Sequence, residues 1–249
     1  MKPRVGLRAM FAAVSFAALS SASAGAPPAG FEQRVEKVRT DLGVPGDAIT
    51  IVENGQPALV RGWGTRLIGT AAPVGPQTIF PTGSTGKAFT TAALAILVDR
   101  GRLKWNDPVI DHMPGFRMWD PWVTREITVR DLLVHRSGLG LGAGDLLFLP
   151  NSTLSRKETV ERLRHIKPAT SFRSGYAYDN VLYMVAGQLI EEVSGRTWEQ
   201  FVREEIFRPL GMDESTVSGQ EFHATENRAH AHSRSDGPIV GLGAQKPLD

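Results

Sequence analysis

The apolar residues of the chain recur at two different spacings near its start. Between residues 31 and 42 they lie three or four positions apart and Gly43 follows, which predicts an amphipathic helix that ends there. Two shorter apolar runs, 48–52 and 58–60, flank Asn54-Gly55. An Asn-Gly pair between two such runs is the strongest short-range signal for a β-hairpin.

Further along the chain, the pattern predicts mainly helices. Residues 88–98 are small or apolar on nearly every side and Gly101 follows, which predicts a helix buried between layers. Another helix is predicted from about Asn180 to Val193, ended by Gly195. Capping-box patterns predict the starts of three more helices, at Thr128/Asp131, Ser155/Glu158 and Thr197/Gln200. Helices therefore dominate from 105 to about 210, and the front hairpin has no evident strand partner.

The first 24 residues have the pattern of a secretory signal peptide. Three basic residues precede an apolar run over 9–19, and Ala22-Ser23-Ala24 forms an A-x-A cleavage site. The run is too short to span a bilayer, and the chain has no cysteine that could accept a lipid. We expect cleavage after Ala24 and a periplasmic or secreted protein without a membrane span.

Charge and cysteine content narrow the function classes. Residues 1–24 hold three of the 28 basic residues and none of the 26 acidic ones, so the charges of the remaining chain nearly cancel. This balance argues against nucleic acid as a partner. The absence of cysteine excludes a disulfide framework and a thiol nucleophile. Residues 25–249 suit one large domain, with room for a subdomain.

The chemistry is concentrated first in Ser84-Thr85-Gly86-Lys87. Residues i and i+3 share a helix face, so the Lys87 amine can reach the Ser84 oxygen and, once deprotonated, activate it as a nucleophile. At a helix start, free N–H groups would also favour negative charge developing near Ser84. Taken alone, the motif fits a capping serine beside a solvated lysine about equally well.

A second group of polar residues, Tyr178-Asp179-Asn180, precedes the later helix. A phenol near an ammonium favours its anionic form, so Tyr178 could share proton transfer with Lys87. Asn180 could bind a substrate amide through hydrogen bonds. The alternative is an aromatic residue packed under a loop, with Asn180 capping the helix.

Together the two motifs resemble the penicillin-recognising serine hydrolases, in particular the branch of class C beta-lactamases and D-peptidases or esterases. The resemblance covers nearly all of 25–249 and includes these further segments: Thr78-Ile79-Phe80, Asp131-Leu132-Leu133-Val134-His135-Arg136-Ser137-Gly138-Leu139 and Pro209-Leu210-Gly211-Met212. It implies a mixed α+β, beta-lactamase/transpeptidase-like fold. Such a fold has an antiparallel sheet with packed helices and an all-helical subdomain. The hairpin and nucleophile helix would lie within 31–101 and the mostly helical region within 105–215.

By this resemblance, Ser84 is the acylated nucleophile, Lys87 and Tyr178 form the general acid/base pair, and Asn180 orients the substrate. The implied function is a serine hydrolase that acts through an acyl-enzyme on an amide, ester or beta-lactam bond of a small molecule or peptide, without cofactor or metal. Two alternatives stay open. The chain could be a non-catalytic module that binds peptide or peptidoglycan, or an inactive truncated relic.

Histidines offer two competing interpretations. His135 could form a triad with Ser84, but the resemblance places it in a structural turn. His230 and His232, with His223 nearby, could bind a metal, yet their polar surroundings favour solvated side chains. An α/β-hydrolase elbow is excluded because Thr82 stands where glycine is required.

The family's third motif, Lys-Thr-Gly or His-x-Gly on a late strand, does not occur between Asn180 and Asp249. We therefore expect the C-terminal strands of the sheet to be absent, unless a complementing C-terminal fragment supplies them. In this family that strand gives the second oxyanion donor. Loss of one such donor costs about 3 to 4 kcal/mol of transition-state stabilisation.

Overall fold

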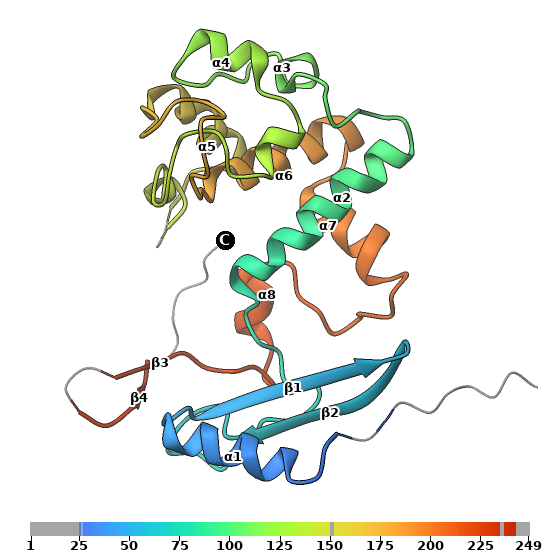
Figure 1. The fold of residues 1–249 in the computed structure, drawn as a ribbon, viewed down its shortest axis with the longest axis vertical. Coiled ribbons are helices and arrows are strands. Elements are labelled where there is room, and N and C mark those ends of the chain that lie inside the picture. Colours follow the sequence, from blue (N-terminus) through green and yellow to red (C-terminus); the bar gives the residue numbers. More distant parts are fainter. Residues whose placement is uncertain (1–24, 26, 150–151, 235–236, 243–249) are drawn as a thin grey trace, which may run out of the picture.

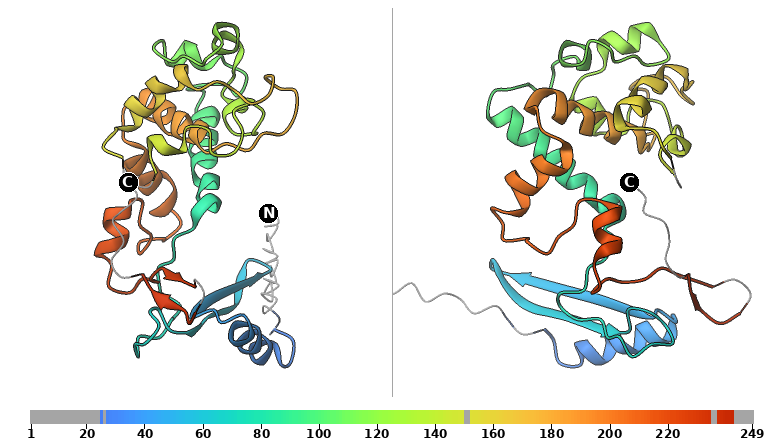
Figure 2. Two further views of the ribbon diagram at one scale, coloured as in Figure 1. Left: turned by 90° about the vertical axis from the view of Figure 1, so that its left-hand side faces the viewer. Right: turned by 180° about the vertical axis from the view of Figure 1, so that it is seen from behind.

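A computed structural model describes residues 25, 27–149, 152–234 and 237–242. Its two parts are joined by helix α2 (Lys87–Asp99), as Figure 1 shows. One part contains helix α1 (Phe31–Asp41) and the hairpin of β1 (Gly46–Glu53) and β2 (Gln56–Gly64). The other part is helical (Figure 2). The predicted signal peptide lies outside the described residues.

The predicted hairpin is confirmed. Strands β1 and β2 pair antiparallel, from Gly46 opposite Gly64 to Glu53 opposite Gln56. The turn residues Asn54 and Gly55 have φ angles of 51° and 73°. Two successive left-handed residues match the twist of the flanking strands, which explains the choice of asparagine and glycine here.

Helix α1, also predicted, lies along the hairpin (Figures 1 and 2). Glu32 on the helix forms an ion pair with Arg61 on β2. Arg39 donates a hydrogen bond of 2.8 Å to the carbonyl oxygen of Val44, just before β1. These contacts attach the helix to β2 and to the segment that leads into β1.

The hairpin sheet has two strands among the described residues, so each strand has an unpaired edge. Val52 and Val60 are 63% and 45% exposed. Exposed edges and apolar side chains of this kind agree with the expected shortage of later strands. The second strand pair is very short, with β3 (His232–Ser233) against β4 (Val240–Gly241), and the sequence did not indicate it.

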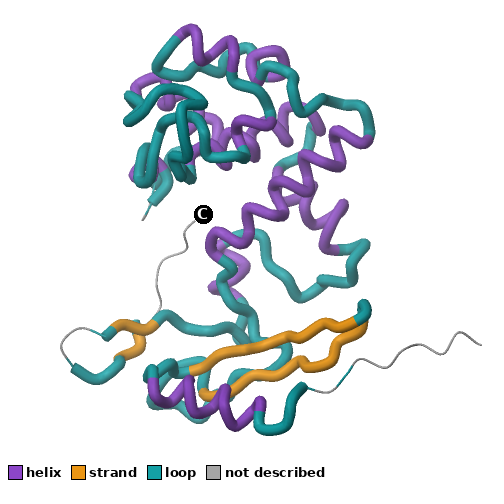
Figure 3. Tube along the Cα trace, in the orientation of Figure 1, coloured by secondary structure: helices purple, strands orange, loops and turns teal. Residues whose placement is uncertain are grey.

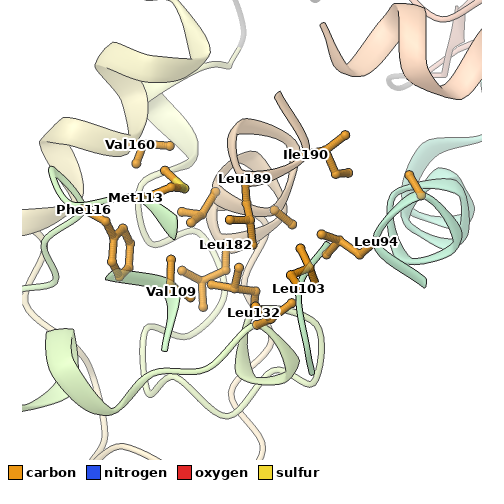
Figure 4. Packing of buried hydrophobic residues seen from close by; sticks show 14 of the residues in the cluster. Leu94, Leu103, Val109, Met113, Phe116, Leu132, Val160, Leu182, Leu189 and Ile190 are labelled. Carbon is orange, nitrogen blue, oxygen red and sulfur yellow. The ribbon is translucent and has the colours of Figure 1, made fainter. Parts of the chain in front are cut away.

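The core lies in the helical part, around α6 (Val181–Ser194). Figure 4 shows Leu182, Leu189 and Ile190 among the packed side chains of this cluster. Helix α2 also packs against α6. The sequence predicted that α2 would be buried on nearly every side. Its buried residues instead occupy one face, at Thr90, Ala93, Leu94 and Leu97.

Short helices complete this part (Figure 3). The α-helices are α3 (Val109–His112), α4 (Pro121–Glu126), α5 (Arg156–Arg162), α7 (Trp198–Val202) and α8 (Gly219–Ala224). Single 3₁₀ turns are η2 (Arg130–Leu132), η3 (Asp145–Leu147) and η4 (Leu163–His165), and η5 (Arg203–Phe207) is a π-helical turn. Within the described residues, no helix is long and apolar enough to cross a membrane.

Two of the three predicted capping boxes are confirmed, at the starts of α5 and α7. The box at Thr128 is wrong as a start of an α-helix, because only the 3₁₀ turn η2 follows it. Asp131 does accept a 2.9 Å hydrogen bond from the Thr128 N–H, but it also pairs with Arg173. The left-handed backbone of His135, with φ of 55°, then turns the chain away from a helical path.

Candidate active site

Ser84 lies in a 3₁₀ turn, η1 (Gly83–Gly86), directly before α2. We expected it in the first turn of an α-helix, but α2 itself begins at Lys87. The predicted proximity still holds, because Lys87 Nζ lies 3.0 Å from Ser84 Oγ. Ser84 is exposed, so a substrate could reach its side chain.

Tyr178 and Asn180 come to the same place from the segment that opens α6. The Tyr178 hydroxyl lies 2.8 Å from Ser84 Oγ and 3.0 Å from Lys87 Nζ. Lys87 also donates a 2.8 Å hydrogen bond to Asn180 Oδ1. The structure thus brings together all four residues that the two motifs predicted.

The start of α6 is fixed by Asp179, which is buried between Tyr178 and Asn180. Its two carboxylate oxygens accept hydrogen bonds from the Leu182 N–H (3.1 Å) and the Ser137 hydroxyl (3.0 Å). Burial raises the pKa of Asp179, and the hydrogen bonds oppose this rise. Asp179 therefore anchors the segment that presents Tyr178 and Asn180.

The His135 ring packs against the Tyr178 ring. The two rings are 4.4 Å apart between centroids, and His135 Nδ1 accepts a 3.3 Å hydrogen bond from the Asp179 N–H. No hydrogen bond joins His135 to Ser84 in the described part of the chain. This arrangement fits the expected structural turn, while the stacking on Tyr178 had no signal in the sequence.

The electrostatics of the site favour the anionic form of Tyr178. Hydrogen bonds from Lys87 and then from Ser84 lower the pKa of its phenol. The Lys87 ammonium also lies over two aromatic rings, 5.2 Å from the Tyr178 centroid and 5.3 Å from that of Tyr183. The site thus combines a hydroxyl, an ammonium and a phenol of lowered pKa within hydrogen-bond distance.

Asp145 belongs to the same network, although no pattern in the sequence indicated it. Its Oδ2 accepts a 3.0 Å hydrogen bond from Asn180 Nδ2. The residue follows a run of glycines at 138, 140, 142 and 144 in a segment without clear periodicity. A lone aspartate in such a loop gives no local signal of its partner.

The histidines near the C-terminal strands have other partners. His232 Nε2 accepts a 3.0 Å hydrogen bond from the Ile68 N–H, which ties β3 to the loop after β2. Burial lowers the pKa of His230. Among the described residues, no cluster of three or more His, Asp or Glu side chains is placed to hold a metal ion.

The mixed helix-and-sheet architecture and the Ser-Lys-Tyr cluster define the class of penicillin-binding-protein-like serine hydrolases. A family model described as Beta-lactamase matches residues 31–247. The chain therefore belongs to the beta-lactamase family, as its motifs indicated.

Similar proteins agree with this assignment. An unguisins hydrolase from Aspergillus campestris is 32% identical over 204 residues, which cover 78% of this chain and 37% of that protein. An octameric penicillin-binding protein homologue from Pyrococcus abyssi superposes with a TM-score of 0.73 at 27% identity, covering 84% of this chain and 49% of the other. A D-amino acid amidase from Ochrobactrum anthropi gives a TM-score of 0.69 at 25% identity, over 82% of this chain and 55% of the other. The chain thus spans only about a third to a half of the length of these proteins.

Proposed function

We propose that this chain carries the acylating half of a serine hydrolase, with Ser84 as the nucleophile. The observation that carries the proposal is the triangle of short contacts between Ser84, Lys87 and Tyr178. The substrate would be a small molecule or peptide with an amide, ester or beta-lactam bond. The names of the relatives, which include an amidase and a hydrolase, support this range.

The donor count of Lys87 suggests how the proton moves. An ammonium has three N–H donors, and here they meet Ser84 Oγ, Tyr178 Oη and Asn180 Oδ1. With all three donors engaged, the Ser84 proton can point to a Tyr178 phenolate. Tyr178 would then take this proton as the serine oxygen bonds to the substrate carbonyl carbon.

The second half of the reaction reverses the proton transfer. The tetrahedral intermediate collapses, the bond to the leaving group breaks, and Tyr178 returns the proton to that group. A water molecule then attacks the acyl carbon and gives a proton to the Tyr178 phenolate. The bond from the acyl carbon to Ser84 Oγ breaks, Tyr178 passes the proton to Ser84 Oγ, and the acid is released. Lys87 stays charged throughout and stabilises the phenolate.

The test is covalent labelling of the folded protein with a fluorophosphonate and with a fluorescent penicillin, followed by peptide mass spectrometry. We expect an adduct on Ser84 that Ser84→Ala abolishes. Ser174→Ala, which removes another exposed serine, close to Tyr178 in the sequence, should leave labelling unchanged. Protein that unfolds cooperatively but carries no adduct would refute the proposal and favour a binding role.

The proposal includes export and a partner for the hairpin sheet. The leader over 1–24 supports a periplasmic or secreted location. The two unpaired sheet edges and the greater length of the relatives support a complementing C-terminal segment. Sequencing beyond codon 249 tests whether the same gene encodes it. A Lys-Thr-Gly or His-x-Gly triplet is expected there, and a stop codon at position 250 would contradict a segment in the same chain.

A further inference from the structure

Asp145 controls which way the Asn180 side chain faces. Asn180 Nδ2 donates to Asp145 Oδ2 at 3.0 Å, while its Oδ1 accepts from Lys87 at 2.8 Å. An ionised carboxylate can only accept hydrogen bonds, so it binds the NH₂ end of the amide. The carbonyl end is then left for the ammonium. With the amide reversed, an N–H donor would face Lys87 and a carbonyl oxygen would face the carboxylate.

The loop before Asp145 is built for close approach to α6. Gly144 has a φ of 79°, and a Cβ at this position would lie 2.8 Å from Ile166 Cδ1 and 3.2 Å from Val181 Cγ2. Val181 is the residue directly after Asn180. After the glycine, the 3₁₀ turn η3 continues to Phe148, which packs against the core. The positive φ thus favours glycine, a Cβ would force Ile166 or Val181 to shift, and the close approach places Asp145 beside Asn180.

The carboxylate of Asp145 is only partly satisfied. Its Oδ1 is buried, and no described residue donates a hydrogen bond to it. A buried acceptor without a partner destabilises the fold, so the position is poorly explained by stability alone. The charge also reaches the site, because it acts to raise the pKa of Tyr178 against the larger effects of Lys87 and Ser84.

We infer that Asp145 is a positioning residue of this site, which fixes the Asn180 amide and so holds the Lys87 ammonium between Ser84 and Tyr178. The inference rests on the proposed acyl transfer for its effect on rate. The orientation of Asn180 and the charge near Tyr178 are present in the resting protein, so both can be tested without measuring activity.

The experiment compares Asp145→Asn and Asp145→Leu with the unchanged chain. In Asp145→Asn the amide oxygen can still accept from Asn180, so most of the rate of Ser84 labelling by a fluorophosphonate should remain. Asp145→Leu provides no acceptor, and labelling should slow by up to about 100-fold, as for a catalytic group displaced by about 1 Å. Asp111→Asn, which neutralises an exposed carboxylate on α3, is the control and should change nothing.

Titration of the phenol gives a second readout that does not need activity. Ultraviolet difference absorbance reports the ionisation of Tyr178 once the spectrum of the Tyr178→Phe variant is subtracted. Asp145→Asn removes a negative charge that opposes ionisation, so the Tyr178 midpoint should move to lower pH. A carboxylate whose charge does not reach the site would leave this midpoint unchanged.

Two results would overturn the inference: an unchanged labelling rate in folded Asp145→Leu, or an unchanged Tyr178 midpoint in Asp145→Asn. If the unchanged chain is not labelled at all, the proposed function fails, and the titration alone then decides the role of Asp145.

A pair of glycine variants tests the loop. Gly142 and Gly144 have similar φ angles, 83° and 79°, but a Cβ on Gly142 would meet no atom within 4 Å. Gly144→Ala should therefore slow labelling much more than Gly142→Ala. Equal effects of the two variants would contradict the role of close loop packing.

Discussion

Lys87 is the residue at which the hydrogen bonds of the site converge. Its ammonium contacts one group from its own helix turn, Ser84, and two from the segment before α6, Tyr178 and Asn180. Because the Lys87 ammonium contacts both Ser84 and Tyr178, its charge acts on both groups of the proposed proton transfer. The effect of removing this charge can be measured at Tyr178.

We predict that Lys87→Met moves the ionisation of Tyr178 to higher pH. The ammonium is the largest cause of the lowered phenol pKa, so the pKa should return towards its ordinary value of 10.0. Because Tyr178 would then be protonated and could not take the Ser84 proton, Ser84 labelling should fall by about 100- to 10,000-fold, the usual contribution of a general base. Difference absorbance and labelling rates measure the two effects.

Lys37→Met is the matched control, because Lys37 is an exposed lysine on α1 that pairs with Asp41. It should leave the Tyr178 midpoint and the labelling rate unchanged. A Tyr178 midpoint that stays in place in Lys87→Met would contradict an effect of the Lys87 charge on Tyr178.

At the scale of elements, the site depends on the junction between α6 and the loop that contains His135 and Ser137. Asp179 joins the two, since it accepts from the Leu182 N–H of the helix and from the Ser137 hydroxyl of the loop. His135 adds the contact with the Asp179 N–H. The position of Tyr178 is thus set by the residue that follows it in the chain.

Replacing Asp179 by alanine should lower the free energy of unfolding by about 1 to 2 kcal/mol, the usual effect of losing a helix-start acceptor. Asp179→Asn keeps an oxygen that can accept from the Leu182 N–H, so its loss should be smaller. Urea denaturation of both variants measures the difference. Equal losses would show that this hydrogen bond contributes little.

At the scale of the whole molecule, ion pairs connect the end of α2 to the segment after α7. Glu205 in η5 accepts from Arg100 at 2.9 Å and from Arg196 at 2.7 Å. Hydrogen bonds from Arg100, and then from Arg196, lower the pKa of Glu205 from 4.5 to about 2. The charged carboxylate thus stabilises the fold at pH values above its ordinary pKa.

This stabilisation should be present above pH 4.5 and be lost as the pH falls towards 2, since the folded pKa is the lower one. Glu205→Gln should therefore lower the free energy of unfolding at neutral pH by about 1 kcal/mol or less. On acidification, the free energy of unfolding of this variant should fall less than that of the unchanged chain. Denaturation at neutral and acid pH measures this. Glu204→Gln, which removes one exposed partner of Arg196, is the control and should have a smaller effect. An equal deficit of Glu205→Gln at all pH values would contradict the assignment.

Much of the architecture follows from local sequence signals. Asn54-Gly55 determines the hairpin because its two residues readily adopt left-handed φ angles. The boxes at Ser155 and Thr197 determine helix starts because each side chain satisfies a backbone N–H within three residues. The same rule fails at Thr128, where the Asp131 carboxylate also pairs with Arg173, a partner distant in sequence.

The candidate site also follows partly from local sequence signals and partly from contacts between distant segments. The sequence by itself determined Ser84 and Lys87 as neighbours, because three residues in a helical turn place them on one side, and the motif around Tyr178 completed the set. Only the tertiary structure decided that the Tyr178 hydroxyl contacts both of them, that His135 stacks on its ring, and that Asp145 binds the Asn180 amide. These contacts join segments 35 to 94 residues apart. Ser84 meets Tyr178 because α2 packs against α6, whereas His135 and Asp145 reach the start of α6 from loops that precede it in the chain.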